Sequence, residues 1–251
     1  MSLFDYSLYF GLTLVLSTLF ATGGVGSAIG LVPVLETAGL PLALARALGL
    51  FVNTTSTIMA AGVHLRSGLL KLGHAWPLVV SVLVATPAGA WASRFVAPDI
   101  VRALLAAFLI AASLLILVSR RPVIAHSHAP APLLVIGGSI GAVSGLVGVG
   151  GGMLMVPALV LLGHEAKSAA RTVSFVIPFS SAGGFVTYLQ FVAMDWALLA
   201  VVGVAAAAGG YLGGNLMNRR LNAGHVKKLI AVLLLLLAGK LLTAPLLSLF
   251  T

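Results

Sequence analysis

The sequence predicts an all-α polytopic membrane protein built from two repeats. Of its 251 residues, 60% are hydrophobic and only 8% are charged, which is far more apolar than the composition of a soluble domain. Apolar runs of about 20 residues follow one another along the chain, each long enough to cross a hydrocarbon core of roughly 30 Å. Glycine, proline and tryptophan landmarks also recur in the same order in both halves.

The net charge of +9 does not call for a nucleic-acid partner. The lysines and arginines fall in short loops beside apolar spans, where the positive-inside rule expects them, so the lipid bilayer is the expected partner. No Lys or Arg precedes the first apolar run, and we expect the segment from Tyr6 onward to be a retained helix. The chain has no cysteine, so disulfide and thiol chemistry are excluded, and no cofactor is expected.

The first repeat is predicted over residues 1–118. An apolar helix over residues 6–21 reaches a glycine-rich stretch that contains Gly24 and Gly26, and a short apolar piece with Pro33 follows. Three further spans are predicted at residues 42–63, 76–96 and 100–118. Residues 119–132 form a hydrophilic linker, and its His126 and His128 have no third ligand nearby, so no metal site is expected.

The second repeat is predicted over residues 133–251. A helix over residues 133–147 reaches the cluster Gly150-Gly-Gly152, and a short piece over residues 153–162 covers only about 15 Å, too little to span untilted. Glycines spaced four apart in the first of these helices, Gly137, Gly141 and Gly145, predict close packing with another helix. Three further spans are predicted at residues 168–190, 196–217 and 226–242.

An offset of 124 residues superposes landmarks of the two halves. It pairs Pro33 with Pro157, Gly24 with Gly148, Gly26 with Gly150, and Gly39 with Gly163. The total distribution of Lys and Arg fits both parallel and inverted repeats. The loop before Trp76 is basic, whereas the matching loop before Trp196 carries only Asp195, as expected if the two loops face opposite compartments. Inversion is therefore the favoured arrangement.

The glycine-rich stretches are predicted to open the helices inside the bilayer. Each glycine weakens a helix by about 1 kcal/mol, and Pro157 removes a backbone donor, so a continuous helix is not expected. Such a break is tolerated only where protein or water surrounds it. A short helix that starts at a break presents N–H groups and the positive end of its dipole, which favours an anion.

Neutral donors near the breaks complete the predicted substrate site. The candidate substrate-binding residues are Gly24, Gly26, Asn53, Thr54, Ser56, Gly150, Gly151, Gly152, Arg171, Thr172, Ser174, Ser180 and Ser181. For the polar run around Asn53, packing between helices is an equal alternative. Arg46 and Arg171 could add charge, but both lie near span ends, where snorkelling to the interface is the favoured interpretation.

The acidic residues bear on the direction of transport. All five lie towards the ends of spans, so the sequence offers no proton relay at depth, which favours outward movement of an anion. A rival function is an intramembrane enzyme using Ser144, but no Gly-x-Ser-x-Gly frame surrounds that residue, so no catalytic residues are expected. An anion channel is a second rival that the sequence does not separate from a carrier.

The run Gly148-Val-Gly-Gly-Gly-Met-Leu-Met-Val-Pro157, followed by Gly163 and Ala170-Arg-Thr-Val-Ser174, resembles the signature of the TauE/SafE-type sulfite exporter family. A degenerate copy lies between Gly24 and Pro33, and the resemblance covers essentially the whole chain. It implies a multi-pass transporter of the bacterial inner membrane that exports sulfite, an organosulfonate or another small anion. Ser27, Ala28 and the valine before Ser174 depart from the family pattern. These departures bear on the identity of the substrate more than on the fold. The oligomeric state is open, with a homodimer as one alternative.

Overall fold

The computed structural model describes residues 3–24, 26–68, 75–118, 130–164 and 166–218, with residues 232, 235, 238 and 239 beyond them. Within these ranges the regular structure is helical. The elements are α1 (Leu3–Thr22), α2 (Ala28–Thr37), α3 (Leu42–Arg66), α4 (Trp76–Ala92), the 3₁₀ turn η1 (Ser93–Phe95), α5 (Pro98–Val118), α6 (Pro130–Val147), α7 (Gly152–Leu161), α8 (Ala166–Tyr188) and α9 (Trp196–Asn218). By length and apolarity, five of them could each cross a membrane: α1, α3, α4, α6 and α9.

The predicted breaks are present, with two corrections to the expected boundaries. Pro157 lies inside α7, so the glycines alone interrupt the second hairpin. The helix α6 begins at Pro130, within the predicted linker, because proline is well tolerated where the first helical N–H needs no partner. The linker histidines and the predicted span over residues 226–242 lie outside the described residues, apart from the few positions named above.

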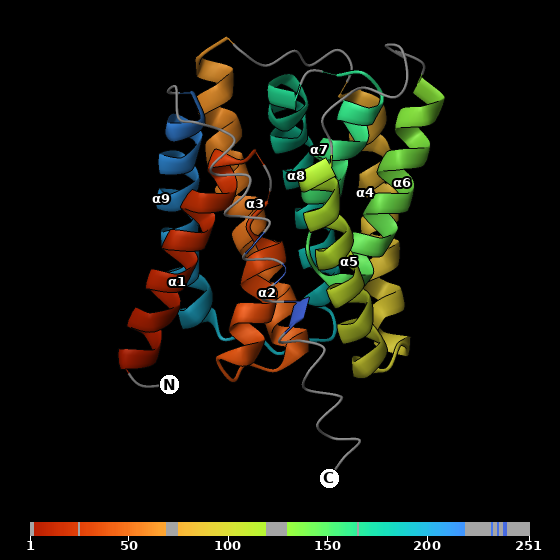
Figure 1. Ribbon diagram of the computed structural model, residues 1–251. Helices are drawn as coiled ribbons and strands as arrows, with labels where there is room; N and C mark the ends of the chain where they lie inside the picture. The colour runs from red at the N-terminus through yellow and green to blue at the C-terminus, as the bar shows by residue number, and fades with distance from the viewer. Residues whose placement is uncertain are drawn as a thin grey trace.

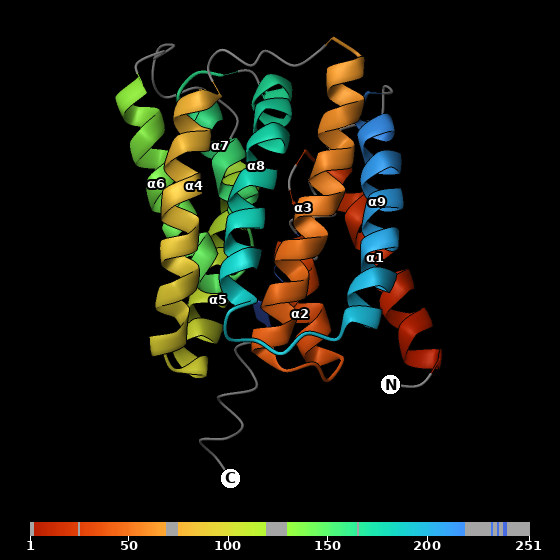
Figure 2. The ribbon, with the colours of Figure 1, turned by 180° about the vertical axis from the view of Figure 1, so that it is seen from behind.

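The two halves interlock instead of standing side by side (Figures 1 and 2). In the centre, α3 packs against α8. On one side α1 packs against α9, and on the other α6 packs against α4, so the first helix of each half contacts the other half. The short helix α2 packs on α3, and the short helix α7 packs on α8. Both breaks therefore lie beside the central helices α3 and α8.

Matching helices of the two halves run in opposite directions. In Figure 1, α1, α3 and α9 rise from the lower end, while α6, α8 and α4 descend. This is the relation that an inverted repeat requires. The repeat itself stays a prediction, because the last span of the second half lies outside the described residues.

The offset of 124 residues also relates turns in the structure. Gly39 and Gly163, which follow the two short helices, have φ angles of 99° and 92°. After each of them the next N–H closes the helix end, from Leu40 to the Leu35 carbonyl at 3.1 Å and from His164 to the Leu159 carbonyl at 3.0 Å. Both short helices therefore end in the same glycine-dependent cap.

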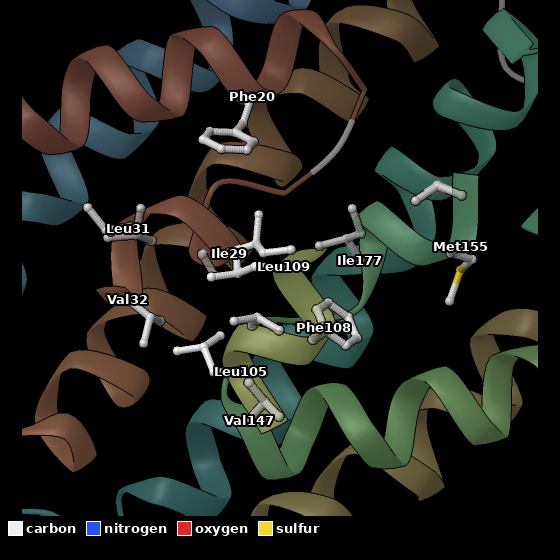
Figure 3. Packing of buried hydrophobic residues seen from close by; sticks show 14 of the residues in the cluster. Phe20, Ile29, Leu31, Val32, Leu105, Phe108, Leu109, Val147, Met155 and Ile177 are labelled. Atoms are coloured by element: carbon white, nitrogen blue, oxygen red, sulfur yellow. The ribbon is translucent and has the colours of Figure 1, made fainter. Parts of the chain in front are cut away.

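Apolar side chains fill the space around the short helices (Figure 3). Ile29 of α2, Val147 of α6 and Ile177 of α8 belong to one buried cluster. Leu105 and Leu109 of α5 extend into the same cluster and are fully buried. The two breaks thus lie in protein and not against lipid, as an opened backbone at this depth needs.

Glycines let the long helices touch backbone to backbone. A Cβ on Gly145 of α6 would overlap the Thr86 carbonyl of α4, and a Cβ on Gly89 of α4 would overlap the Ala142 carbonyl of α6. Gly209 and Gly213 of α9 approach α1 in the same way. The predicted packing role of the α6 glycines is confirmed by these contacts.

We expect Gly145→Ala to destabilise the protein by about 1–3 kcal/mol, because the added Cβ must push α6 away from α4. Gly138→Ala is the matched control on the same helix, since a Cβ there meets nothing within 4 Å. It should be neutral or stabilising by up to about 1 kcal/mol. Unfolding midpoints in detergent, followed by circular dichroism, would check both variants. Equal midpoints would contradict the packing analysis.

Candidate functional site

The first break separates α1 from α2 at Gly24. This glycine has a φ of 70°, a left-handed conformation that side chains disfavour. Its backbone lies directly against Ala170 of α8, since a Cβ on Gly24 would be 3.1 Å from the Ala170 Cα. The Ser174 hydroxyl donates to the Ala170 carbonyl of its own helix at 2.9 Å and also lies 3.4 Å from the Gly24 carbonyl, so α8 places a polar side chain beside the opened backbone.

The second break separates α6 from α7 and depends more heavily on glycine. Gly148, Gly150 and Gly151 have φ angles of 80°, 72° and 64°. The N–H groups of Gly148 and Val149 donate to the Ser144 carbonyl at 2.8 and 2.9 Å, which closes the end of α6. Three left-handed residues within four positions explain why the sequence needs this glycine cluster.

The two breaks meet each other around Asn53 of α3. A Cβ on Gly152 would lie 3.4 Å from the Gly26 nitrogen. Cβ atoms on Gly26 and on Gly150 would overlap opposite ends of the Asn53 side-chain amide. Gly150 also lies close to Ser181 of α8. The chain places glycine here because no side chain fits between the breaks and the amide.

Hydrogen bonds fix the Asn53 amide between the two breaks. Its Nδ2 donates to Ser181 Oγ at 2.7 Å. Its Oδ1 accepts at 3.5 Å from the backbone N–H of Ala28, which is the first residue of α2. The side chains of both Asn53 and Ser181 are fully buried, at 0% exposed. We call Gly26, Ala28, Asn53, Gly150 and Ser181 the junction.

A line of hydroxyl groups extends from the junction towards α1. Ser27 and Ser56 are within hydrogen-bond distance at 3.3 Å, and Ser17 donates to Ser27 at 3.5 Å. All three are buried. Ser27, a departure from the family pattern, therefore adds a donor beside the start of α2.

The structure brings most of the predicted site residues together, and separates a few. Gly24, Gly26, Asn53, Ser56, Gly150, Gly152, Ser174 and Ser181 lie at the breaks or bond to them. Gly151 lies at the second break but faces Ser144 and Ile140 of α6. Ser180 pairs with Thr86 of α4 at 2.7 Å, so its hydroxyl is used in packing α8 against α4.

Three predicted residues have no hydrogen bond to the breaks among the described residues. Thr54 donates to the Leu50 carbonyl of its own helix, and neither Thr172 nor Arg171 has a hydrogen bond to another element among the described residues. Thr54 lies about 100° around α3 from Asn53, which directs it elsewhere. Ser17, Thr86 and Tyr188 are buried polar residues that the sequence reasoning did not select. A polar residue within an apolar run, paired with Thr18 in the case of Ser17 and isolated in the case of Thr86, is the signal that could have found the first two.

The snorkelling interpretation is wrong for Arg46. This residue of α3 is buried, and its Nη1 donates to the Leu146 carbonyl at the end of α6, at 3.1 Å. Its aliphatic part lies across Gly148, since a Cβ on that glycine would be 2.6 Å from Arg46 Cγ. Arg46 therefore points inward to the second break instead of outward to the membrane surface.

The acidic residues that the structure describes lie at or beside helix ends. Asp5 and Asp99 are in first turns, Glu36 is in the last turn of α2, and Asp195 precedes α9 and accepts from the Leu198 N–H at 3.0 Å. Within the described ranges, the junction is thus lined by neutral donors and backbone. Such a set of groups can hold an anion and has no carboxylate to accept a proton.

Sequence comparison agrees with the resemblance. A family model described as sulfite exporter TauE/SafE matches residues 9–241. The chain belongs to this family. Membership agrees with a multi-pass membrane protein, since five helices are long and apolar enough to span.

Two curated proteins resemble parts of this TauE/SafE family member. The probable membrane transporter protein YunE of Bacillus subtilis is 32% identical over 107 residues, which is 41% of this chain and 38% of the relative. The probable membrane transporter protein MJ0441 of Methanocaldococcus jannaschii is 38% identical over 58 residues, 23% of this chain and 22% of the relative. The matches thus cover well under half of each relative's length. No solved structure matches the chain.

The TauE/SafE assignment gives the serine-hydrolase alternative no support. Ser144 is buried, and its hydroxyl donates to the Gly141 carbonyl of its own helix at 3.0 Å. A hydroxyl held this way, against the backbone of the second break, has a packing role.

We expect Gly150→Ala to reduce transport by about 100-fold, because the new Cβ would displace both Asn53 and Ser181 at the junction. Gly68→Ala is the matched control. Gly68 has a similar φ of 63° but open space around its Cβ position, so that variant suffers only the backbone strain of about 1 kcal/mol. Flux per correctly inserted protein in proteoliposomes would check both. Equal losses would show that strain, and not the junction, limits transport.

Proposed function

We propose that this protein exports a small anion, sulfite or an organosulfonate, across the bacterial inner membrane and binds it at the junction. The observation that carries the proposal is the meeting of two helix breaks around one buried amide. The family description supports the sulfur oxyanion, because backbone and hydroxyl donors alone do not distinguish sulfite from other oxyanions.

The electrostatics of the junction favour a negative ligand. The helices α2 and α7 begin at the two breaks, so each directs the positive end of its dipole to this region. The first N–H groups of a helix have no acceptor within the helix, and an anion can supply one. Ser27 at the first break, Ser56 of α3 and Ser181 of α8 add hydroxyl groups.

The Asn53 amide occupies the position that a substrate oxygen would take. Its Oδ1 accepts from the Ala28 N–H at 3.5 Å, which is a long hydrogen bond. An anionic oxygen forms a shorter and stronger charge-assisted bond with the same donor. Binding would then turn the amide so that Nδ2 also donates to the anion. The substrate thereby replaces an internal hydrogen bond without leaving a buried donor unsatisfied.

Export needs no proton relay if the membrane potential drives it. An inside-negative potential of 100 mV favours outward movement of one negative charge by about 2.3 kcal/mol, roughly a fiftyfold concentration ratio. The end positions of the described acidic residues agree with this mode of energy coupling.

In proteoliposomes, we expect the purified protein to move sulfite and methanesulfonate down the electrical gradient. The rate should increase as a valinomycin-clamped potential is made more negative on the side that holds the anion. Saturation with substrate and acceleration by anion on the opposite side would indicate a carrier, whereas linear, non-exchanging flux would indicate a channel. Absence of flux for sulfite, methanesulfonate, sulfoacetate, sulfate and bicarbonate alike would refute the proposal.

Asn53→Asp should reduce sulfite flux at least about tenfold, because a carboxylate of nearly the same shape would repel the anion at the junction. Asn215→Asp is the matched control on α9, where the amide donates to the Tyr211 carbonyl of its own helix. That variant should transport at the wild-type rate. Full activity of Asn53→Asp would show that the anion does not approach this amide.

A further inference from the structure

Arg46 is a buried cation on the central helix α3. It lies in the second turn of α3, and the residue is only 6% exposed. Its aliphatic part runs across Gly148, so the guanidinium lies beside the break between α6 and α7. A charged group held inside a membrane protein is costly, which makes a function for it the default hypothesis.

The hydrogen-bonding capacity of Arg46 is largely unused. Of the five N–H donors of a guanidinium, one makes a hydrogen bond to a described residue, from Nη1 to the Leu146 carbonyl at 3.1 Å. The Nε is buried and has no hydrogen-bond partner in the part of the chain that the structure describes. The guanidinium carbon lies 5.3 Å from the centre of the Tyr188 ring, a cation–π contact that stabilises the charge without accepting a hydrogen bond.

Within the described residues, no carboxylate forms an ion pair with Arg46. Glu36 is near enough to attract it, but the Glu36 Oε1 is bound to Arg102 of α5 at 2.7 Å. Arg102 also pairs with Asp99 at 2.8 Å, so these two acids are paired with a different arginine. The charge of Arg46 is therefore left without a direct counter-ion beside the break.

Arg46 and Asn53 lie on the same face of α3. They are seven residues apart, which is two turns or about 10 Å along the helix. Both face the second break, Arg46 at Gly148 and Asn53 at Gly150. In Figure 1, α3 begins at the lower end, so Arg46, in its second turn, precedes Asn53 on a path from that end to the junction.

We propose that Arg46 supplies the counter-charge for the transported anion. This inference rests on the proposed function and adds a charged residue to the neutral junction. The guanidinium exchanges the neutral Leu146 carbonyl for two oxygens of the substrate, and its planar fork suits a sulfite or sulfonate group. The buried Nε provides one of those two bonds, which accounts for a donor that the structure leaves without a partner.

A purely structural role, capping the end of α6, does not account for these features. Arg46 does lie at the negative end of the α6 dipole, which is a favourable position for a cation. The offset of 124 residues, however, pairs Arg46 with Ala170, and Ala170 lies against Gly24 as Arg46 lies against Gly148. The first break is thus closed by an alanine, so neither the glycine turn nor the helix end requires an arginine.

The test compares Arg46→Gln with Arg66→Gln, an exposed arginine on the same helix, in proteoliposomes. We expect Arg46→Gln to raise the sulfite concentration for half-maximal flux about tenfold or more, and Arg66→Gln to leave it unchanged. Sulfite and methanesulfonate should also raise the unfolding temperature of the wild type and Arg66→Gln, but not that of Arg46→Gln. If Arg46 only caps α6, Arg46→Gln lowers the unfolding temperature but changes neither the half-saturating sulfite concentration of flux nor the rise in unfolding temperature with added anion.

If Arg46→Gln does not fold, Arg46→Lys tests the inference, because lysine keeps the positive charge and lacks the planar donor geometry of the guanidinium. We expect Arg46→Lys to transport sulfite with a half-saturating concentration higher than that of the wild type. An unchanged half-saturating concentration in a folded Arg46→Gln or Arg46→Lys protein would overturn this inference alone. A wild-type protein that neither transports nor is stabilised by any anion tested would overturn both the proposed function and this inference.

Discussion

Backbone groups inside a bilayer need partners, and this constraint organises the whole protein. Opening a helix at mid-depth exposes N–H and C=O groups that lipid cannot satisfy. Here each break is covered by the central helices α3 and α8, and the two breaks lie against each other. The Asn53 amide bonds at one end to the start of α2 and at the other to Ser181 beside the second break. One polar side chain therefore links the irregular segments of both halves.

The interlocked packing of the long helices holds the glycine-rich breaks in place. Because α1 packs on α9 and α6 packs on α4, each break is anchored by a helix of the opposite half. Glycines at Gly89, Gly145, Gly209 and Gly213 bring these helices into backbone contact. Close contact of this kind resists local distortion, so movement of a break is coupled to movement of whole helices. Such coupling is what a carrier needs if one binding site is to face two compartments in turn.

The distribution of charge separates the surface from the centre. The described acids are at or beside helix ends, and Glu36 and Asp99 are paired with Arg102. Asn53, Ser27, Ser56 and Ser181 provide neutral donors in the centre. Among the described residues, Arg46 brings a buried guanidinium against the second break. A site with many donors and one positive charge is matched to a small anion, because a buried negative ligand needs both hydrogen bonds and charge compensation.

The sequence by itself determined the membrane class, the order of the described helices and the positions of both breaks, because apolar length and glycine conformation are local properties. Gly148 and Gly150 adopt the left-handed backbone that their residue type permits. Tertiary structure decided which polar groups face the centre. Ser181 bonds to Asn53 while its neighbour Ser180 bonds to Thr86, because adjacent helical residues point about 100° apart and only the neighbouring helix sets their direction. It also decided the inward direction of Arg46, since an arginine near a span end is expected to reach the surface until the packing of α6 is known.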